Sequence, residues 1–174
     1  MDTRLLLMSH ASTAAQRAGR FPADDPLDAR GLAEVQAEAA RLRAAIPADA
    51  AAFASPAVCA RDTALALGLA ATPDPALADL NYGDWRGQRL AELAAQAPED
   101  LAAWTRDPDA APHGGETFSQ LAKRVGAWLD ALGDATGDTS NPTRNIIAIT
   151  HAPLLRAAIV HTLQASPAVF ARIE

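Results

Sequence analysis

The sequence predicts an α/β fold, a three-layer sandwich with a mostly parallel sheet and helices on both faces. Two short apolar runs, LLLM at 5–8 and IIAIT at 146–150, are typical of buried strands, because each is brief and ends in polar residues. Between such runs lie segments with helical spacing of apolar residues, and this alternation favours a doubly wound sheet. The length of 174 residues, without an internal repeat or a dividing linker, predicts a single domain over 1–174.

The first half of the chain alternates strand, helix, strand and helix. Asp28 can cap a helix in which apolar residues recur at spacings of three and four. Ser55-Pro56 is a favourable helix start, because serine caps and proline fits the first helical position. The predicted elements are a strand at 5–8, an irregular loop at 11–27, a helix at 28–46, a strand at 51–54 and a helix at 55–69.

The second half opens with a Pro-rich segment and ends in the strand with the strongest pattern. Phe118, Leu121, Val125 and Leu129 mark one apolar helix face, and Pro153 can open the last helix. The predicted elements are a loop or edge strand at 77–87, helices at 88–96 and 99–106, a loop at 107–116, a helix at 118–133, a polar, turn-rich segment at 134–145, a strand at 146–150, a helix at 153–163 and a last strand at 168–173.

Composition excludes several classes of partner. The net charge is −6 and the lysines and arginines do not cluster, which argues against a nucleic-acid groove. No apolar run approaches 18 residues, so no membrane partner is expected. Cys59 is the only cysteine, which excludes an internal disulfide and favours a reducing compartment. The N-terminal residues do not form a secretory signal, so we predict a cytoplasmic protein. The oligomeric state is not readable from the sequence.

Two strands end in the same way, with a small polar residue, a histidine and an alanine. These junctions are Ser9-His10-Ala11 and Thr150-His151-Ala152. Ligands of open parallel sheets bind beyond the carboxyl ends of the strands, so both histidines are expected to face one crevice. A lone histidine at a strand end is more often satisfied by the backbone. The repetition of the junction favours a functional site.

Six short motifs follow one another in a defined order along nearly the whole chain. They are Ser9-His10-Ala11-Ser12-Thr13, Gly19-Arg20-Phe21, Ser55-Pro56 with Thr63-Ala64, Gly83-x-Trp85-x-Gly87, Gly115-Glu116-Thr117 and His151. Each motif is weak alone, but in this order they resemble the histidine phosphatase superfamily, the phosphoglycerate-mutase-like group. The resemblance implies hydrolysis of a phosphomonoester through a phosphohistidine, with a small phosphorylated metabolite as partner and no cofactor.

The resemblance also implies roles for individual residues. His10 is expected to be the nucleophile, which suits an imidazole that is largely neutral near pH 7. His151 is expected to donate hydrogen bonds to the phosphoryl oxygens, and Asp79 to protonate the leaving group. The expected substrate-binding residues are Ser9, Thr13, Gln16, Arg20 and Cys59.

The sequence departs from the family pattern where that pattern carries positive charge. Ser9 and Cys59 stand where the family has its two phosphate-binding arginines, and Asp79 stands where glutamate is usual. Losing one donor to a transferred group typically costs about 10²–10³ in rate. A weak or altered phosphatase is therefore expected, unless another arginine reaches the phosphate. The candidates for that compensation are Arg17, Arg20 and Arg61.

The alternative is a catalytically inactive family member that binds a metal or small ligand in the remodelled pocket. His10, Cys59, Asp79 and His151 would supply two nitrogens, a sulfur and an oxygen, a set that suits zinc or cobalt(II). Cys59 is equally readable as a small buried hydrophobe. His113, in the polar loop, is expected to be exposed, and Arg156 to be structural.

Overall fold

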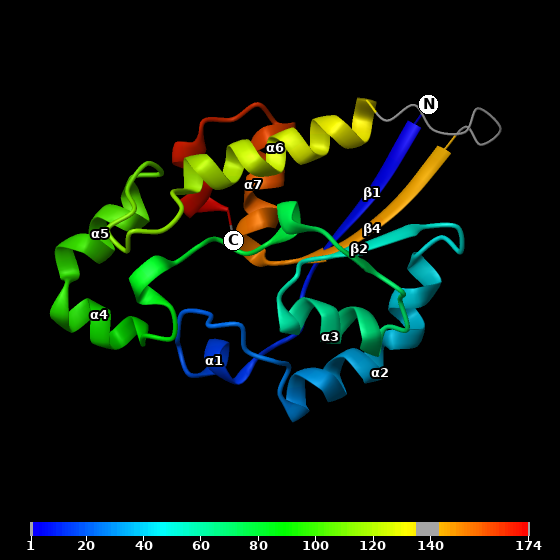
Figure 1. Cartoon of the computed structure of the whole chain (residues 1–174), viewed down its shortest axis with the longest axis horizontal. Helices are drawn as coiled ribbons and strands as arrows, with labels where there is room; N and C mark the ends of the chain where they lie inside the picture. The colour runs from blue at the N-terminus through cyan, green and yellow to red at the C-terminus, as the bar shows by residue number, and fades with distance from the viewer. Residues whose placement is uncertain (1, 135–142, 174) are drawn as a thin grey trace.

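The computed structural model describes residues 2–134 and 143–173 and confirms the predicted α/β architecture (Figure 1). Its strands pair in parallel to form one sheet in the order β1-β4-β2-β3. Ser9 at the end of β1 is in register with Thr150 at the end of β4, so these two strands stop at the same level. The strands are β1 (Asp2–Ser9), β2 (Ala51–Ala54), β3 (Thr72–Pro73) and β4 (Thr143–Thr150).

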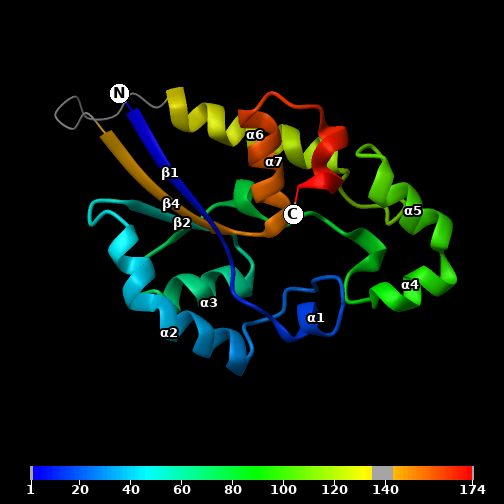
Figure 2. The same ribbon diagram turned by 180° about the vertical axis from the view of Figure 1, so that it is seen from behind.

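Helices cover both faces of the sheet, which confirms the three-layer arrangement. Figures 1 and 2 show α2 and α3 on one side and α6 and α7 on the other. Over the ranges that the structure describes, no helix combines the length and apolarity needed to cross a membrane. The helices are α1 (Ala14–Arg17), α2 (Ala29–Ala45), α3 (Val58–Ala66), α4 (Leu90–Gln96), α5 (Pro98–Arg106), α6 (Phe118–Asp134) and α7 (Ala152–Thr162), with 3₁₀ turns η1 (Pro75–Leu77), η2 (Gly83–Trp85) and η3 (Pro167–Arg172).

The two sides of the sheet have separate apolar cores. Ala148 of β4 joins the core beneath α6 and α7, whereas the next residue, Ile149, joins the core beneath α2 and α3. This alternation follows from the two-residue period of a strand, and burial on both faces explains why β4 is a nearly continuous apolar run. The core beneath α2 and α3 is thin, because alanines form much of it.

The predicted strand at 168–173 is wrong, because this segment forms the 3₁₀ turn η3. The Ser166 side chain accepts a hydrogen bond from the Ala168 amide, and Pro167 occupies the first helical position. Phe170 stacks on Phe118 of α6, with ring centroids 4.3 Å apart. This end of the chain therefore packs on a helix and does not pair with a strand.

Three further segments differ from their predictions. The loop at 11–27 contains the short helix α1, whereas the segment at 77–87, predicted as a loop or an edge strand, is indeed a loop and contains the turn η2. The edge strand is β3, within the segment read as Pro-rich, where Phe53 is in register with Thr72. β4 begins at Thr143, inside the segment predicted to be turn-rich, and residues 135–142 of that segment lie outside the described part.

Gly31 in the first turn of α2 allows the loop after His10 to lie against this helix. A Cβ on Gly31 would overlap the backbone carbonyl oxygen of Ser12.

We expect Gly31→Ala to lower the free energy of unfolding by about 1–3 kcal/mol, because the backbone of Ser12 cannot move aside as a flexible side chain does. Urea denaturation measures the change. The control is Gly133→Ala in α6, where the added Cβ meets nothing within 4 Å. Greater helix propensity should make this variant neutral or more stable by up to about 1 kcal/mol. Equal loss of stability in both variants would contradict the packing argument.

Candidate active site

His10 and His151 meet at the carboxyl edge of the sheet, as their position after two adjacent parallel strands requires. Their ring centroids are 4.9 Å apart with an interplanar angle of 65°. The His10 amide donates to the Thr150 carbonyl at 2.9 Å, which continues the β1–β4 ladder to the first histidine. The expected proximity of the two rings is thus confirmed.

The His10 ring is held so that one nitrogen remains free. Its Nδ1 lies 2.7 Å from the carbonyl oxygen of Ala11, an atom that only accepts, so Nδ1 carries the proton. Burial lowers the pKa of His10 below its ordinary value, although the hydrogen bond to Ala11 opposes this. The imidazole is therefore neutral near pH 7, with a lone pair on Nε2.

His151 is buried, with only 3% of its surface exposed, and each ring nitrogen faces a polar group. Its Nε2 lies 2.8 Å from the Ser55 hydroxyl, which also accepts a hydrogen bond from the Ala57 amide. Its Nδ1 lies 3.4 Å from Oδ2 of Asp79 but makes no hydrogen bond among the described residues. Burial and the adjacent His10 lower the pKa of His151 to about 3. The ring is therefore neutral, and its contact with Asp79 is not an ion pair at neutral pH.

Asp79 is a carboxyl group that retains its proton at unusually high pH. Burial raises the pKa of Asp79 to about 7, and the hydrogen bond from the Leu80 amide opposes this rise, as does the charge of Arg124. Glu116 raises the pKa further. Near neutral pH, Asp79 thus exists in both its acid and its carboxylate form, as a group that gives and takes protons must.

Arg124 of α6 holds the backbone segment that carries Asp79. Its guanidinium donates to the carbonyls of Ala76 at 2.8 Å and Ala78 at 3.0 Å, and it pairs with Glu116 at 2.8 Å. The Glu116 amide in turn donates to the carbonyl of Asn81 at 2.8 Å. Two of the sequence motifs, around Gly83 and Gly115, are therefore joined beside the candidate acid.

We expect Arg124→Ala to lower the free energy of unfolding by about 1–3 kcal/mol, because several partly buried acceptors lose their donor at once. Urea denaturation measures this loss. The matched control is Arg30→Ala, which removes an exposed pair with Glu34 on α2. Exposed pairs contribute little, so its change should stay within about 0.5 kcal/mol. Similar changes in the two variants would show that Arg124 does not hold the segment.

A cavity of about 740 Å³ opens beside the two histidines. Thr13, Gln16, Arg20 and Cys59 line it, as expected of substrate-binding residues, whereas Ser9 at the end of β1 does not. Thr13 and Gln16 also cap α1 reciprocally, since the side chain of each accepts a hydrogen bond from the backbone amide of the other. Their hydrogen bonds therefore position the loop that follows His10.

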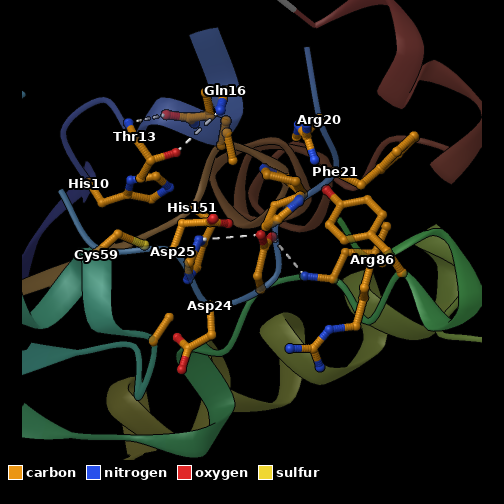
Figure 3. Close-up of a pocket in the computed structure, with 18 of the residues that line it drawn as sticks. His10, Thr13, Gln16, Arg20, Phe21, Asp24, Asp25, Cys59, Arg86 and His151 are labelled. Carbon is orange, nitrogen blue, oxygen red and sulfur yellow. Dashed lines mark hydrogen bonds and ion pairs between the residues drawn. The ribbon is translucent and has the colours of Figure 1, made fainter. Parts of the chain in front are cut away.

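Three arginines line the cavity, and two of them lie across it from His10. Of the three compensating candidates, Arg20 lines the cavity, Arg17 pairs with Asp28 and Arg61 is not a lining residue. Two arginines that sequence reasoning missed, Arg86 and Arg156, also line it. Figure 3 shows Arg20 and Arg86 across the cavity from His10 and Cys59.

The sequence contains a signal that could have placed Arg156 in the cavity, but none for Arg86. Arg156 follows the cavity-lining residue Ala152 by four positions on α7, so helix periodicity places both on one face. Arg156 therefore lines the cavity, in addition to the structural role that its place in the helix predicts. Arg86 lies between Trp85 and Gly87, and no spacing rule distinguishes it there.

His113 is buried and not exposed, contrary to the expectation from its polar loop, with 1% of its surface accessible. Its Nδ1 accepts a hydrogen bond from the Gly115 amide at 2.9 Å, and its carbonyl accepts one from the Asp84 amide at 2.8 Å. Added Cβ atoms on Gly83 and Gly115 would overlap backbone atoms of the facing loop. His113 therefore joins two loops that approach each other closely.

Cys59 faces the cavity from the first turn of α3. Burial raises the pKa of the Cys59 thiol to about 12, and the charges of Asp79 and Asp24 add to this rise. The thiol is thus protonated at neutral pH and is not an activated nucleophile. Thr63 donates to the Cys59 carbonyl at 2.7 Å and accepts from the Ala11 amide at 3.1 Å, which ties this helix to the loop after His10.

Comparison with known proteins agrees with this architecture. The family model of the histidine phosphatase superfamily (branch 1) matches residues 5–174. An adenosylcobalamin/alpha-ribazole phosphatase of Salmonella typhimurium is 30% identical over 167 residues, which cover 92% of this chain and 79% of that protein. A glucosyl-3-phosphoglycerate phosphatase of Mycobacterium tuberculosis is 35% identical over 105 residues, which cover 56% of this chain. That match spans 47% of the mycobacterial protein, about half its length.

Solved structures show the same fold. A mycobacterial glucosyl-3-phosphoglycerate phosphatase in complex with VO3 superimposes with a TM-score of 0.84 at 27% sequence identity, covering 97% of this chain and 85% of that one. The structure of a putative alpha-ribazole-5'-P phosphatase from Escherichia coli, at 24% identity, also gives a TM-score of 0.84. The match covers 99% of this chain and 85% of that chain. At this identity it shows a shared fold only.

Proposed function

We propose that this chain, which belongs to the histidine phosphatase superfamily, is a single-domain phosphomonoester hydrolase that acts weakly and through a phosphohistidine on His10. The observation that carries the proposal is the site itself. A neutral His10 with a free Nε2 lies against His151, and Asp79 lies within 3.4 Å of His151. Nucleophile, proton donor and an additional imidazole are thereby assembled in one cavity.

In the proposed first step, Nε2 of His10 attacks the phosphorus atom while the bond to the ester oxygen breaks. The Asp79 carboxyl gives its proton to the departing oxygen, and the neutral alcohol leaves. In the second step, water attacks the phosphohistidine, Asp79 takes a proton from that water, and inorganic phosphate leaves with His10 restored. His151, through its ring N–H, would donate a hydrogen bond to a phosphoryl oxygen during both steps.

The local charge supports a slow reaction. Phosphoryl transfer relies on positive groups around the equatorial oxygens. Here the groups gathered beside His10 are the neutral imidazole of His151 and the thiol of Cys59, while Arg20 and Arg86 lie on the opposite side of the cavity. These two arginines suit a second anionic group of the substrate better than the transferred phosphoryl group. A small phosphorylated metabolite with such a group is the proposed substrate.

The test combines turnover with isolation of the intermediate. Purified protein is assayed in the presence of a chelator on a chromogenic aryl phosphate, on glucosyl-3-phosphoglycerate and on alpha-ribazole 5'-phosphate. Substrate labelled in the phosphoryl group is then mixed with the protein, which is denatured rapidly. A label on the chain that survives alkali but is lost in acid identifies a phosphohistidine. A folded protein with neither turnover nor label would overturn the proposal and favour an inactive family member that binds a small ligand.

Asp79→Asn separates the proposed acid from the rest of the machinery. We expect a loss of about 10²–10³ in kcat on alkyl phosphates but little loss on a nitrophenyl phosphate, whose leaving group needs no proton. The acid form of Asp79 is the donor, so wild-type activity on alkyl esters should fall as the pH rises through about 7. The variant should lack this decline. Asp100→Asn, an exposed change on α5, is the control. Equal losses on both ester classes would contradict the assignment.

A further inference from the structure

Three potential metal ligands converge at the carboxyl edge of the sheet. His10, Cys59 and His151 each offer one ligand atom, and these atoms lie within 4.8 Å of one another. They come from the ends of β1 and β4 and from α3, so only the folded chain assembles them. Figure 3 shows the three side chains gathered on one wall of the cavity. Two imidazoles and a thiolate form a set that zinc and cobalt(II) prefer.

Each histidine has one ring nitrogen that can bind a metal through its lone pair. Nδ1 of His10 donates to the Ala11 carbonyl, which leaves Nε2 as the free donor atom. Nε2 of His151 contacts the Ser55 hydroxyl at 2.8 Å, and its buried Nδ1 has no hydrogen-bond partner in the described part of the chain. Metal-binding histidines are oriented in this way, with the second ring nitrogen fixed by an oxygen. This Nδ1 is buried 3.4 Å from Oδ2 of Asp79 without a hydrogen bond to it, and it is the ring nitrogen left to bind a metal.

The local field favours a cation over an anion. The negative charges of Asp79 and Asp24 both raise the pKa of the Cys59 thiol. Asp24 also lines the cavity, where its side chain accepts a hydrogen bond from the Val58 amide at 2.9 Å. Cys59 places a soft ligand and no positive charge beside His10 and His151. A phosphate group therefore finds no cationic partner in Cys59, whereas a divalent cation finds a ligand.

We propose that His10, Cys59 and His151 form a binding site for zinc or cobalt(II), with water in the open fourth position. On binding, the Cys59 thiol releases its proton to solvent and its sulfur forms the metal bond, while His10 gives the Nε2 lone pair. A tetrahedral site with metal–ligand bonds of about 2.0–2.3 Å has ligand atoms about 3.4–3.6 Å apart, so the side chains must move inward by about 1 Å. The metal and the phosphoryl group compete for Nε2 of His10. The metal-bound protein is therefore inactive as a phosphatase.

Cobalt(II) titration of metal-free wild-type protein at pH 7.5 tests the site. Cys59 is the only cysteine, so a sulfur-to-cobalt charge-transfer band in the near ultraviolet can arise only from it. We expect one equivalent to bind with this band, Cys59→Ser to lose the band, and His10→Asn to weaken binding at least tenfold. His161→Gln, which changes a partly exposed histidine paired with Asp130, is the matched control and should bind as the wild type does. X-ray absorption of the zinc-loaded wild type should show one sulfur at about 2.3 Å.

Each outcome separates this proposal from the proposed function. Turnover in chelator together with the cobalt band supports both proposals, and zinc should then inhibit turnover competitively with substrate. The band without any turnover supports the metal site alone. If the folded wild type turns over substrate but shows neither the cobalt charge-transfer band nor a zinc–sulfur bond in X-ray absorption, the metal site is overturned. The proposed phosphatase function then stands. A band that persists in folded Cys59→Ser would also overturn it.

Discussion

Replacement of His10 by alanine is expected to abolish phosphomonoesterase activity, with kcat falling by at least about 10³, and to remove the acid-labile phosphoryl label. Loss of a covalent nucleophile typically has an effect of this order or larger. No other described group can replace it, because the Cys59 thiol is protonated and His151 is fixed between Ser55 and Asp79. Steady-state assays in chelator and quantitative labelling measure the two losses.

Chemical rescue distinguishes a nucleophile from a structural residue at this position. The alanine variant leaves space beside His151, and added imidazole should restore part of the turnover without restoring the label on the chain. His161→Ala is the control, because this histidine lies on α7 and pairs with Asp130 away from the cavity. A variant that retains labelling in the absence of His10 would place the covalent step on another residue.

Introduction of arginine at Cys59 is expected to raise kcat/KM for aryl phosphates by about 10²–10³, the amount that a single donor to the transferred group contributes. Cys59 lines the cavity from the first turn of α3, so a guanidinium at this position faces the phosphoryl group bound to His10. Addition of Ser9→Arg should increase the rate further, by an amount that need not add to the first. The matched control is Cys59→Met, which removes the thiol without adding charge and should not raise the rate.

The same variant should also change ligand preference. Inorganic phosphate should bind more tightly to Cys59→Arg than to the wild type, and the cobalt charge-transfer band should disappear. Isothermal titration with phosphate and the cobalt spectrum measure these shifts. Circular dichroism confirms folding, which matters because Cys59 is buried. A folded arginine variant with unchanged turnover and phosphate affinity would show that the pocket lacks more than its positive charge.

The sequence by itself determined the α/β class, the alternation of strands and helices and the two histidine junctions. These features depend on local patterns, namely a short apolar run, a helical spacing and a capping residue, each readable over a few positions. The resemblance to the histidine phosphatase pattern implied that Asp79 and Cys59 share a crevice with His10 and His151, and all four residues line the cavity. For the two histidines the strand pattern was sufficient, because a parallel sheet brings its strand ends to one edge.

Only the tertiary structure decided the environment of each side chain. Arg124 reaches the Asp79 segment across more than forty residues, His113 is buried between two loops, and residues 168–173 pack on α6 instead of pairing as a strand. Burial sets the protonation of Asp79, His151 and Cys59, and burial depends on neighbours that are distant in the chain. A sequence shows which groups are present, but the energy of a charge depends on which groups surround it, and folding determines that.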